Sequence, residues 1–395
     1  MSSLKNLIIG LLFIISLIFP ASVEAVDGKS MIDPLIRSQF DHLPTQEMKH
    51  FWDRFHQEYQ QFFSAGLPQD IFTFLQSMNS KEFSLAEFGK GLLRYFLHEV
   101  LYNGKLLGMI IVLTVLSMIL QTLQTAFEQN QVSRVAYAVV FMVILILAIQ
   151  SFSSAVTAAK AAIGQMVDFM VASVPLLLTL LASMGNLASV ALFHPFIIFM
   201  IHIVSLLIYL VILPFFFFST ILSIVSTISD KYRVDQLARL MNKFSITLLG
   251  GSLTIFLGVL SIQGATAAVT DGIAIRTAKY VTGNFIPVIG RTISDAADTV
   301  LGASLLVKNT LGLAGVIILL MICAFPALKI LSLALIYHFS AAVLQPLGNS
   351  PIIESLGIIG RTLVYVFAAL AAVGLMFFLA ITIMVSAGNI AVMMR

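Results

Sequence analysis

Few residues of this chain have side chains that could do chemistry, and most of them stand alone between apolar runs. Within 286–309, Arg291, Asp295 and Asp298 fall on two helical turns. Arg291 and Asp295 are four residues apart and can pair along a helix, whereas Asp298 has no obvious local partner. A charged side chain at the centre of a bilayer costs about 2.5–3.5 kcal/mol on insertion scales. We therefore expect these three side chains to face interfacial water, an aqueous cavity or an assembly contact.

Two histidines form a second candidate site. His194 and His202 stand eight residues apart, close to one face of a helix. Imidazoles inside a membrane could relay a proton or an ion. The simpler interpretation is that both are neutral and hydrogen-bond a neighbouring helix, and it is favoured because no carboxylate accompanies them.

The chain lacks the motifs of catalytic, metal and phosphate sites. The patterns H-E-x-x-H, G-x-S-x-G and G-x-x-x-x-G-K-[ST] do not occur in it, and its one cysteine, Cys323, lies in an apolar run. We therefore predict no catalytic, cofactor-binding or metal-ligating residue, and no enzyme activity. If the function needs energy, a partner must supply it.

Small residues point to close packing of helices. Gly104 and Gly108 form a G-x-x-x-G pair, a spacing that lets two helices approach closely. Further glycines and alanines, as in "AALAAVG", favour a tight bundle or a homo-oligomer.

The elements that must position these residues are membrane helices. Of the 395 residues, 59% are hydrophobic and only 10% are charged, against about 25% charged in a typical soluble domain. This composition is typical of an integral protein of the lipid membrane. The net charge of +3 is too small and too scattered to suggest a nucleic-acid partner.

The N-terminal part divides into two segments. Residues 1–25 are predicted to be a signal peptide, cleaved after Ala25, because Lys5 precedes an apolar run and small residues follow it; an uncleaved anchor is the alternative. Residues 26–105 are predicted to form an extracytoplasmic amphipathic helical segment. Its clearest apolar stripe, at steps of three and four, consists of Met48, Phe51, Phe55, Tyr59 and Phe62.

The remainder predicts an all-α, polytopic bundle of seven to nine crossings. Residues 106–262 form a first group of transmembrane helices, 263–310 an interfacial, re-entrant or cavity-lining polar segment, and 311–395 a C-terminal group. The clear candidate crossings, of about 20 apolar residues each, are 106–123, 135–156, 166–184, 244–262 and 361–386.

Two apolar runs are too long for one ordinary crossing. Residues 187–228 contain Pro195 and Pro214 and are expected to form two helices in a hairpin, and 311–345 is either one kinked helix or two. Nine crossings with a cytoplasmic C-terminus are favoured, because they bring the basic stretch 230–243 to the cytoplasm.

The order of these features resembles the stage III sporulation protein AE family of endospore-forming bacteria. The stretches that carry the resemblance, from about residue 84 onward, are "GKLLGMIIVLTVLSMILQTLQ", "FHPFIIFMIHIV", "DKYRVDQLARLMNK", "IPVIGRTISDAADTVLGASLLVKN", "GLAGVIILLMICAFPALKI" and "ESLGIIGRTL". The resemblance implies a multi-pass protein of the mother-cell membrane around the forespore. Its implied partners are the other membrane proteins of the same operon, an ATPase among them, and a forespore membrane protein.

The same resemblance implies a function that composition alone does not give. Such proteins work in a secretion-like channel complex that spans the envelope, keeps the forespore active and sustains late forespore gene expression. The main alternative is a stand-alone secondary transporter or permease. An intramembrane enzyme and a purely structural scaffold are two further hypotheses, and the missing motifs weigh against the enzyme.

Overall fold

A computed structural model describes the chain as helices joined by short turns. The described residues are 46–63, 68–71, 73–74, 85–126, 131–228, 234–285, 289–348 and 350–393. Every regular element among them is a helix, which confirms the all-α fold class. The expected signal peptide at 1–25 lies outside the described residues, so its cleavage stays a prediction.

Six described stretches are long and apolar enough to cross a membrane, where seven to nine crossings were expected. They are α5 (Leu85–Tyr102) with α6 (Gly104–Ala126), α7 (Gln131–Ser183), α8 (Leu187–Leu207) with η2 (Ile208–Ile212) and α9 (Leu213–Ile228), α10 (Asp235–Phe285), α11 (Ile289–Leu344) and α12 (Pro351–Met393). The 56 residues of α11 extend over about 84 Å at about 1.5 Å per residue. A bilayer core is only about 30 Å thick, so each long helix exceeds one crossing.

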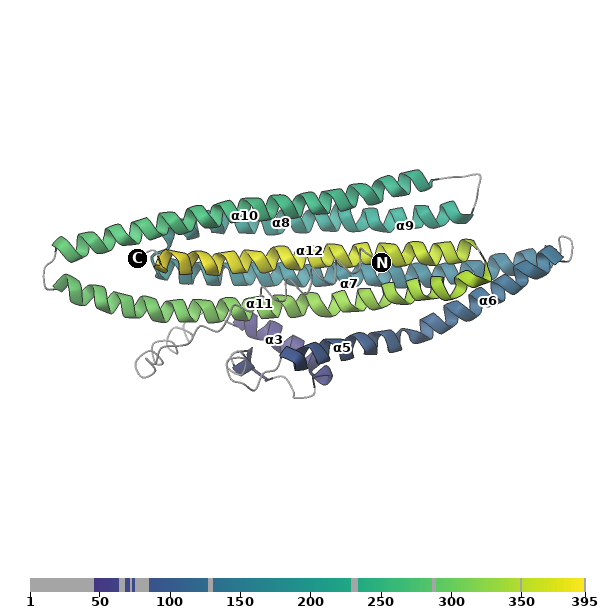
Figure 1. The fold of residues 1–395 in the computed structure, drawn as a ribbon, viewed down its shortest axis with the longest axis horizontal. Coiled ribbons are helices and arrows are strands. Elements are labelled where there is room, and N and C mark those ends of the chain that lie inside the picture. The colour runs from purple at the N-terminus through teal and green to yellow at the C-terminus, as the bar shows by residue number, and fades with distance from the viewer. Residues whose placement is uncertain are drawn as a thin grey trace.

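These helices lie nearly parallel to one axis, and consecutive ones run in opposite directions (Figure 1). The last helix, α12, lies in the middle and contacts α7, α8, α9, α10 and α11. The C-terminal end of α10 and the N-terminal end of α11 extend beyond the α7–α8 turn (Figure 1). We call the part of α10 that follows Asp271 and the part of α11 that precedes Lys308 the α10–α11 hairpin.

The predicted separation of 135–156 from 166–184 is wrong, because both belong to the single helix α7. The gap between them is "TAAKAAIGQ", residues 157–165. It is less apolar than the two predicted crossings, but it is rich in alanine and contains neither proline nor an adjacent pair of glycines. Alanine is the best helix former, so a drop in hydropathy here does not end the helix.

The predicted hairpin at 187–228 is also wrong. Here α8, η2 and α9 follow one another as one rod, with Pro195 inside α8 and Pro214 near the start of α9. The element η2 is π-helical, and the N–H of Leu213 donates to the carbonyl of Ile208, five residues back. A proline ring crowds the preceding turn of an α-helix, and such a local widening accommodates it without reversing the chain.

The polar segment 263–310 is divided between two helices. Residues 263–285 continue α10, and 289–310 begin α11, which runs on through 311–344 as one helix with Pro326 inside it. The depth of this segment relative to a bilayer stays a prediction.

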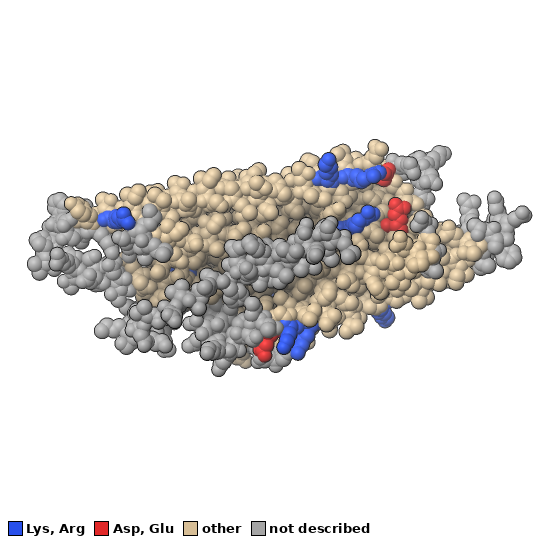
Figure 2. Space-filling model, viewed as in Figure 1, with Lys and Arg blue, Asp and Glu red and all other residues tan. Residues whose placement is uncertain are grey.

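The core of the bundle is built mainly by α11 and α12. In the most apolar window of each, 61% of the residues are buried, against 17–33% in the other four spans. The outer helices instead expose large apolar side chains, among them Val112, Ile146, Leu210 and Ile262. Such surfaces suit lipid or protein partners. On the face in Figure 2, charged side chains gather near helix ends and along α5, with uncharged surface between them.

The N-terminal segment packs against the bundle. It contains α3 (Gln46–Tyr59), η1 (Gln60–Phe62) and α5. The predicted stripe of α3 does face the bundle, since Met48 and Phe55 are buried and Phe51 packs edge-to-face on Phe169 of α7, with 5.3 Å between ring centroids. Its extracytoplasmic location stays a prediction.

Candidate functional site

The structure does not bring the predicted site residues into one described cluster. Arg291, Asp295 and Asp298 lie in the first turns of α11, but their side chains are outside what the structure describes. Their exposure to water or a partner therefore stays a prediction.

Both histidines lie on the outer surface of α8, which buries Phe193, Ile197 and Ile201 on its other face. Nδ1 of His202 lies 2.8 Å from the carbonyl oxygen of Ile198 in the same helix. The rings therefore point away from the bundle interior, and their part in proton transfer stays untested.

The two glycines of α6 are also open to the outside. A Cβ added at Gly104 or Gly108 would meet nothing within 4 Å. The G-x-x-x-G pair thus makes no close helix contact within the described chain, and a contact with another chain stays a prediction.

A buried polar cluster lies at the base of the α10–α11 hairpin, and sequence reasoning did not assemble it. Its first member is Asp271 of α10, which is 1% exposed. Its two carboxylate oxygens accept hydrogen bonds from the backbone N–H groups of Ala188, at 2.8 Å, and Ser189, at 3.0 Å. These are N–H groups at the start of α8 that have no partner within the helix, so a carboxylate from α10 caps α8.

The turn from α7 to α8 explains why a distant residue provides this cap. Gly185 adopts a φ of +81°, the left-handed conformation that glycine tolerates. The N–H of Asn186 donates to Leu181, and that of Gly185 donates to Ala182, which together close α7 as a Schellman motif. Asn186 then stands at the N-cap of α8, but its side chain makes no capping hydrogen bond. With Asp271 in that role, the Asn186 amide is free to point elsewhere.

The second charged member is Lys308 of α11, which is also 1% exposed. Its Nζ donates to the carbonyl of Val385, at 2.8 Å, and to Oδ1 of Asn389, at 2.7 Å, both on α12. No described carboxylate pairs with it. A buried ammonium held only by neutral acceptors is costly, and this makes Lys308 a candidate functional residue.

Unpartnered polar atoms lie beside this lysine. Both amide atoms of Asn186 are buried without a partner among the described residues, and so is the hydroxyl of Ser189, whose backbone N–H bonds Asp271. A Cβ added at Gly388 would lie 2.6 Å from Nζ of Lys308 and 3.4 Å from Nδ2 of Asn186. Because Gly388 has no side chain, α12 can approach α7, α11 and the start of α8 closely at this point, around the polar groups of Lys308 and Asn186.

The cluster marks one end of an uncharged stretch of α11. The 20 residues between Lys308 and Lys329 carry no charge, and they span about 30 Å at about 1.5 Å per residue. That length matches the roughly 30 Å core of a bilayer. The geometry is suited to a polar group at the boundary of a membrane, where ions, protons or solutes enter or leave.

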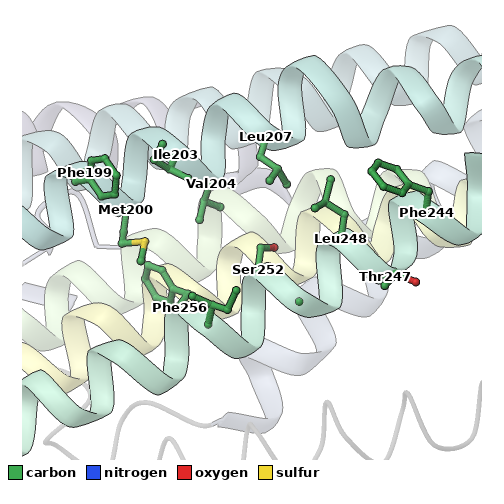
Figure 3. Close-up of a pocket in the computed structure, with 12 residues that line it drawn as sticks. Phe199, Met200, Ile203, Val204, Leu207, Phe244, Thr247, Leu248, Ser252 and Phe256 are labelled. Atoms are coloured by element: carbon green, nitrogen blue, oxygen red, sulfur yellow. The ribbon is translucent and has the colours of Figure 1, made fainter.

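An apolar groove on the outer face is a weaker candidate. It has a volume of about 360 Å³ and lies between α8 and α10, with Phe199, Met200 and Phe256 among its walls (Figure 3). Its only polar side chains are the hydroxyls of Thr247 and Ser252, and that of Ser252 already donates to Leu249. The groove thus offers no group for acid–base chemistry or ion binding.

Comparison with known proteins places the chain in a sporulation family. Residues 69–388 match the family described as stage III sporulation protein AE. A relative with that name from Bacillus subtilis (strain 168) is 59% identical over 179 residues, and this match covers 45% of each chain. No solved structure matches. The family match extends over most of the chain, including every member of the polar cluster except Asn389, and the chain therefore belongs to the stage III sporulation protein AE family.

Proposed function

We propose that this chain is an integral membrane subunit of a sporulation-specific channel, a secretion-like complex that links the mother cell to the forespore across the envelope. In this role it supports forespore maintenance and late forespore gene expression. The observation that carries the proposal is membership of a sporulation family by a chain whose membrane-length bundle buries Asp271 and Lys308.

The buried charges favour a working component over a passive anchor. An anchor needs only apolar helices, and each buried charge lowers the stability of such a helix. Here an acid and a base, from α10 and α11, lie at the base of the same hairpin that carries Arg291, Asp295 and Asp298. A path for polar solutes or a moving contact with another subunit gives both charges a use.

The partners follow from the same proposal. They are other membrane proteins of the same operon, including an ATPase, and a protein of the forespore membrane; the location is the mother-cell membrane around the forespore. An external ATPase accounts for a chain without a nucleotide-binding motif. The exposed apolar side chains of α6, α8 and α10 supply surfaces for such partners or for further copies of this chain.

Deletion of the gene tests the proposal. Forespore volume and a late forespore-specific reporter are recorded after engulfment, with the intact gene restored elsewhere as the control. We expect engulfment to finish, the reporter to stay dark and the forespore to shrink. Normal spores from the deletion strain would contradict the proposed function.

A stand-alone secondary transporter is the second candidate, and the polar cluster also favours it. Its test is solute or proton flux through the purified protein alone in liposomes. Flux that is lost when Asp271 or Lys308 is changed would support the transporter. An absence of flux together with the deletion phenotype above favours the complex.

A further inference from the structure

A partly polar pocket of about 360 Å³, separate from the apolar groove between α8 and α10, lies where α3, η1 and α5 pack against α7 and α11. Aromatic side chains of α3 and α5 form one wall, alanines of α7 form another, and α11 closes the pocket around Pro326. The pocket is far from the Asp271–Lys308 cluster, because Lys329 at its edge is 21 residues, or about 32 Å, along α11 from Lys308.

The aromatic wall is fixed in place. Phe325 of α11 is fully buried, and its ring centroid lies 4.0 Å from that of Tyr59, 4.8 Å from that of Tyr95 and 5.3 Å from that of Phe55. Aromatic pairs with centroids about 4.5–7 Å apart, as Phe325 makes with Tyr95 and Phe55, stabilise their contact beyond simple burial. The pocket is therefore preformed, which reduces the entropy that a ligand loses on binding.

Two opposite charges line this pocket without pairing. Glu99 of α5 is 9% exposed, and its carboxylate accepts hydrogen bonds only from neutral donors, namely Nδ2 of Asn103, at 3.2 Å from Oε2, and the hydroxyl of Tyr95. Lys329 of α11 also lines the pocket and is half-buried. No ion pair joins either group to a described side chain. Charges inside proteins are normally paired, so each of these lacks a counter-charge that a ligand can provide.

The backbone supplies one more acceptor at the same place. Proline has no N–H, so Pro326 cannot donate to the carbonyl of Ile322 one turn earlier. Ile322 and Pro326 both line the pocket. At the exposed rim, Arg54 and Glu58 of α3 add one further charge of each sign.

We propose that this pocket binds a small zwitterion. The ammonium group of the ligand lies at Glu99 and the Ile322 carbonyl, its anionic group lies at Lys329, and its apolar part lies on the wall of Tyr59 and Tyr95. Two sources carry this chemistry, a free amino-acid-like solute and the headgroup of phosphatidylethanolamine. Both can reach the pocket, because Lys329 ends the uncharged stretch of α11 at about the thickness of a bilayer.

Three probes with one carbon skeleton test the charge requirement. The full-length protein in nanodiscs of phosphatidylglycerol is titrated with leucine, with isopentylamine, which lacks the carboxylate, and with 4-methylpentanoate, which lacks the ammonium. We expect leucine to bind about tenfold or more tightly than either single-charge probe, because each probe leaves either Glu99 or Lys329 without a counter-charge. Equal binding of all three, or of none in both lipid conditions below, would overturn the proposal.

Variants locate the binding to this pocket. Glu99→Gln keeps the size of the side chain, and Glu99→Gln and Lys329→Gln should each weaken leucine binding about tenfold. Asp168→Asn is the matched control, because Asp168 is an exposed acid of α7 that does not line the pocket. Ala158→Leu fills the pocket without changing charge and should abolish binding. Circular dichroism and the melting temperature establish that each variant is folded. If folded Glu99→Gln and Lys329→Gln bind like Asp168→Asn, the pocket is not the site.

A lipid exchange separates the two sources. Phosphatidylethanolamine replaces part of the phosphatidylglycerol, and the melting temperature is compared between the intact protein and Glu99→Gln. A rise in the intact protein alone, without leucine binding, identifies the headgroup as the ligand; leucine binding identifies a solute. Neither result depends on sporulation, so a failure here leaves the deletion test of the proposed function untouched.

Discussion

Asp271→Asn tests whether the carboxylate of α10 holds the start of α8. The substitution keeps the size of the side chain but removes its charge and one acceptor oxygen. One of the N–H groups of Ala188 and Ser189, both now bonded to Asp271, would then face an amide NH₂ group. The structure thus predicts a local loss at one helix terminus.

The expected magnitude comes from these two bonds. A hydrogen bond to a charged group contributes about 1.5–3 kcal/mol, and loss of a side-chain cap costs about 0.5–2 kcal/mol. Since the asparagine oxygen still accepts one bond, we expect a cost of about 2–3 kcal/mol for this site. That corresponds to about a 30- to 140-fold larger population of the locally opened state.

Hydrogen–deuterium exchange of the amides of Ala188 and Ser189 measures that population directly. The matched control is Asp235→Asn at the first turn of α10, where the acid pairs with Arg239 on the exposed surface. Exposed pairs contribute at most about 1 kcal/mol, so the control should leave α8 unchanged. If Asp271→Asn also leaves exchange at 188 and 189 unchanged, the capping role is wrong.

Three other substitutions test the packing, by thermal unfolding unless stated. Gly388→Ala places a Cβ 2.6 Å from Nζ of the buried Lys308, so the free energy of unfolding should fall by about 1–3 kcal/mol. The matched control is Gly258→Ala, where a Cβ has open space around it. This control should leave the free energy of unfolding unchanged or raise it by up to about 1 kcal/mol. Phe325→Ala should lower the free energy of unfolding by about 3–5 kcal/mol and speed proteolysis within 46–63, because the ring of Phe325 packs on Phe55 and Tyr59 of α3. Phe339→Ala, at a 53% exposed position, is the control and should do neither. Equal effects of the two substitutions would contradict the idea that Phe325 anchors α3. Burial, and then the neighbouring glutamate, raises the pKa of Tyr59 above its ordinary value of about 10. The neutral phenol therefore contributes its full stabilisation below pH about 10, and this contribution is lost as the pH rises further. The melting temperature of Tyr59→Phe should thus fall less at alkaline pH than that of the intact protein. Equal falls in melting temperature would refute this prediction.

The sequence allowed correct prediction of the helical class and of which α3 residues face the bundle. Both depend on local signals, namely long apolar runs and steps of three and four between apolar residues. The helix boundaries were harder to predict. Lower hydropathy around Lys160 suggested a break, but alanine continues the helix there, and Pro214 produced a π-helical turn instead of the expected hairpin.

The polar cluster could not be assembled from the sequence, because its members are far apart in it. Asn186, Asp271, Lys308 and Asn389 form no motif, and only the antiparallel packing of α8, α10, α11 and α12 brings them to one level. One signal was available, since Asp271 and Lys308 are the outer charges of the polar segment 263–310, where each adjoins an apolar run. The pocket at Glu99 and Lys329 likewise depends on contacts across 230 positions.

The most direct test of the account is complementation of the deletion strain with Lys308→Met. Methionine keeps the length and the apolar stem of the side chain but cannot donate to Val385 and Asn389. The account predicts that the variant reaches the membrane at the level of the intact protein while the late forespore reporter stays dark. A normal reporter with full spore yield would contradict a working role for the buried cluster and leave the chain a passive member of the membrane.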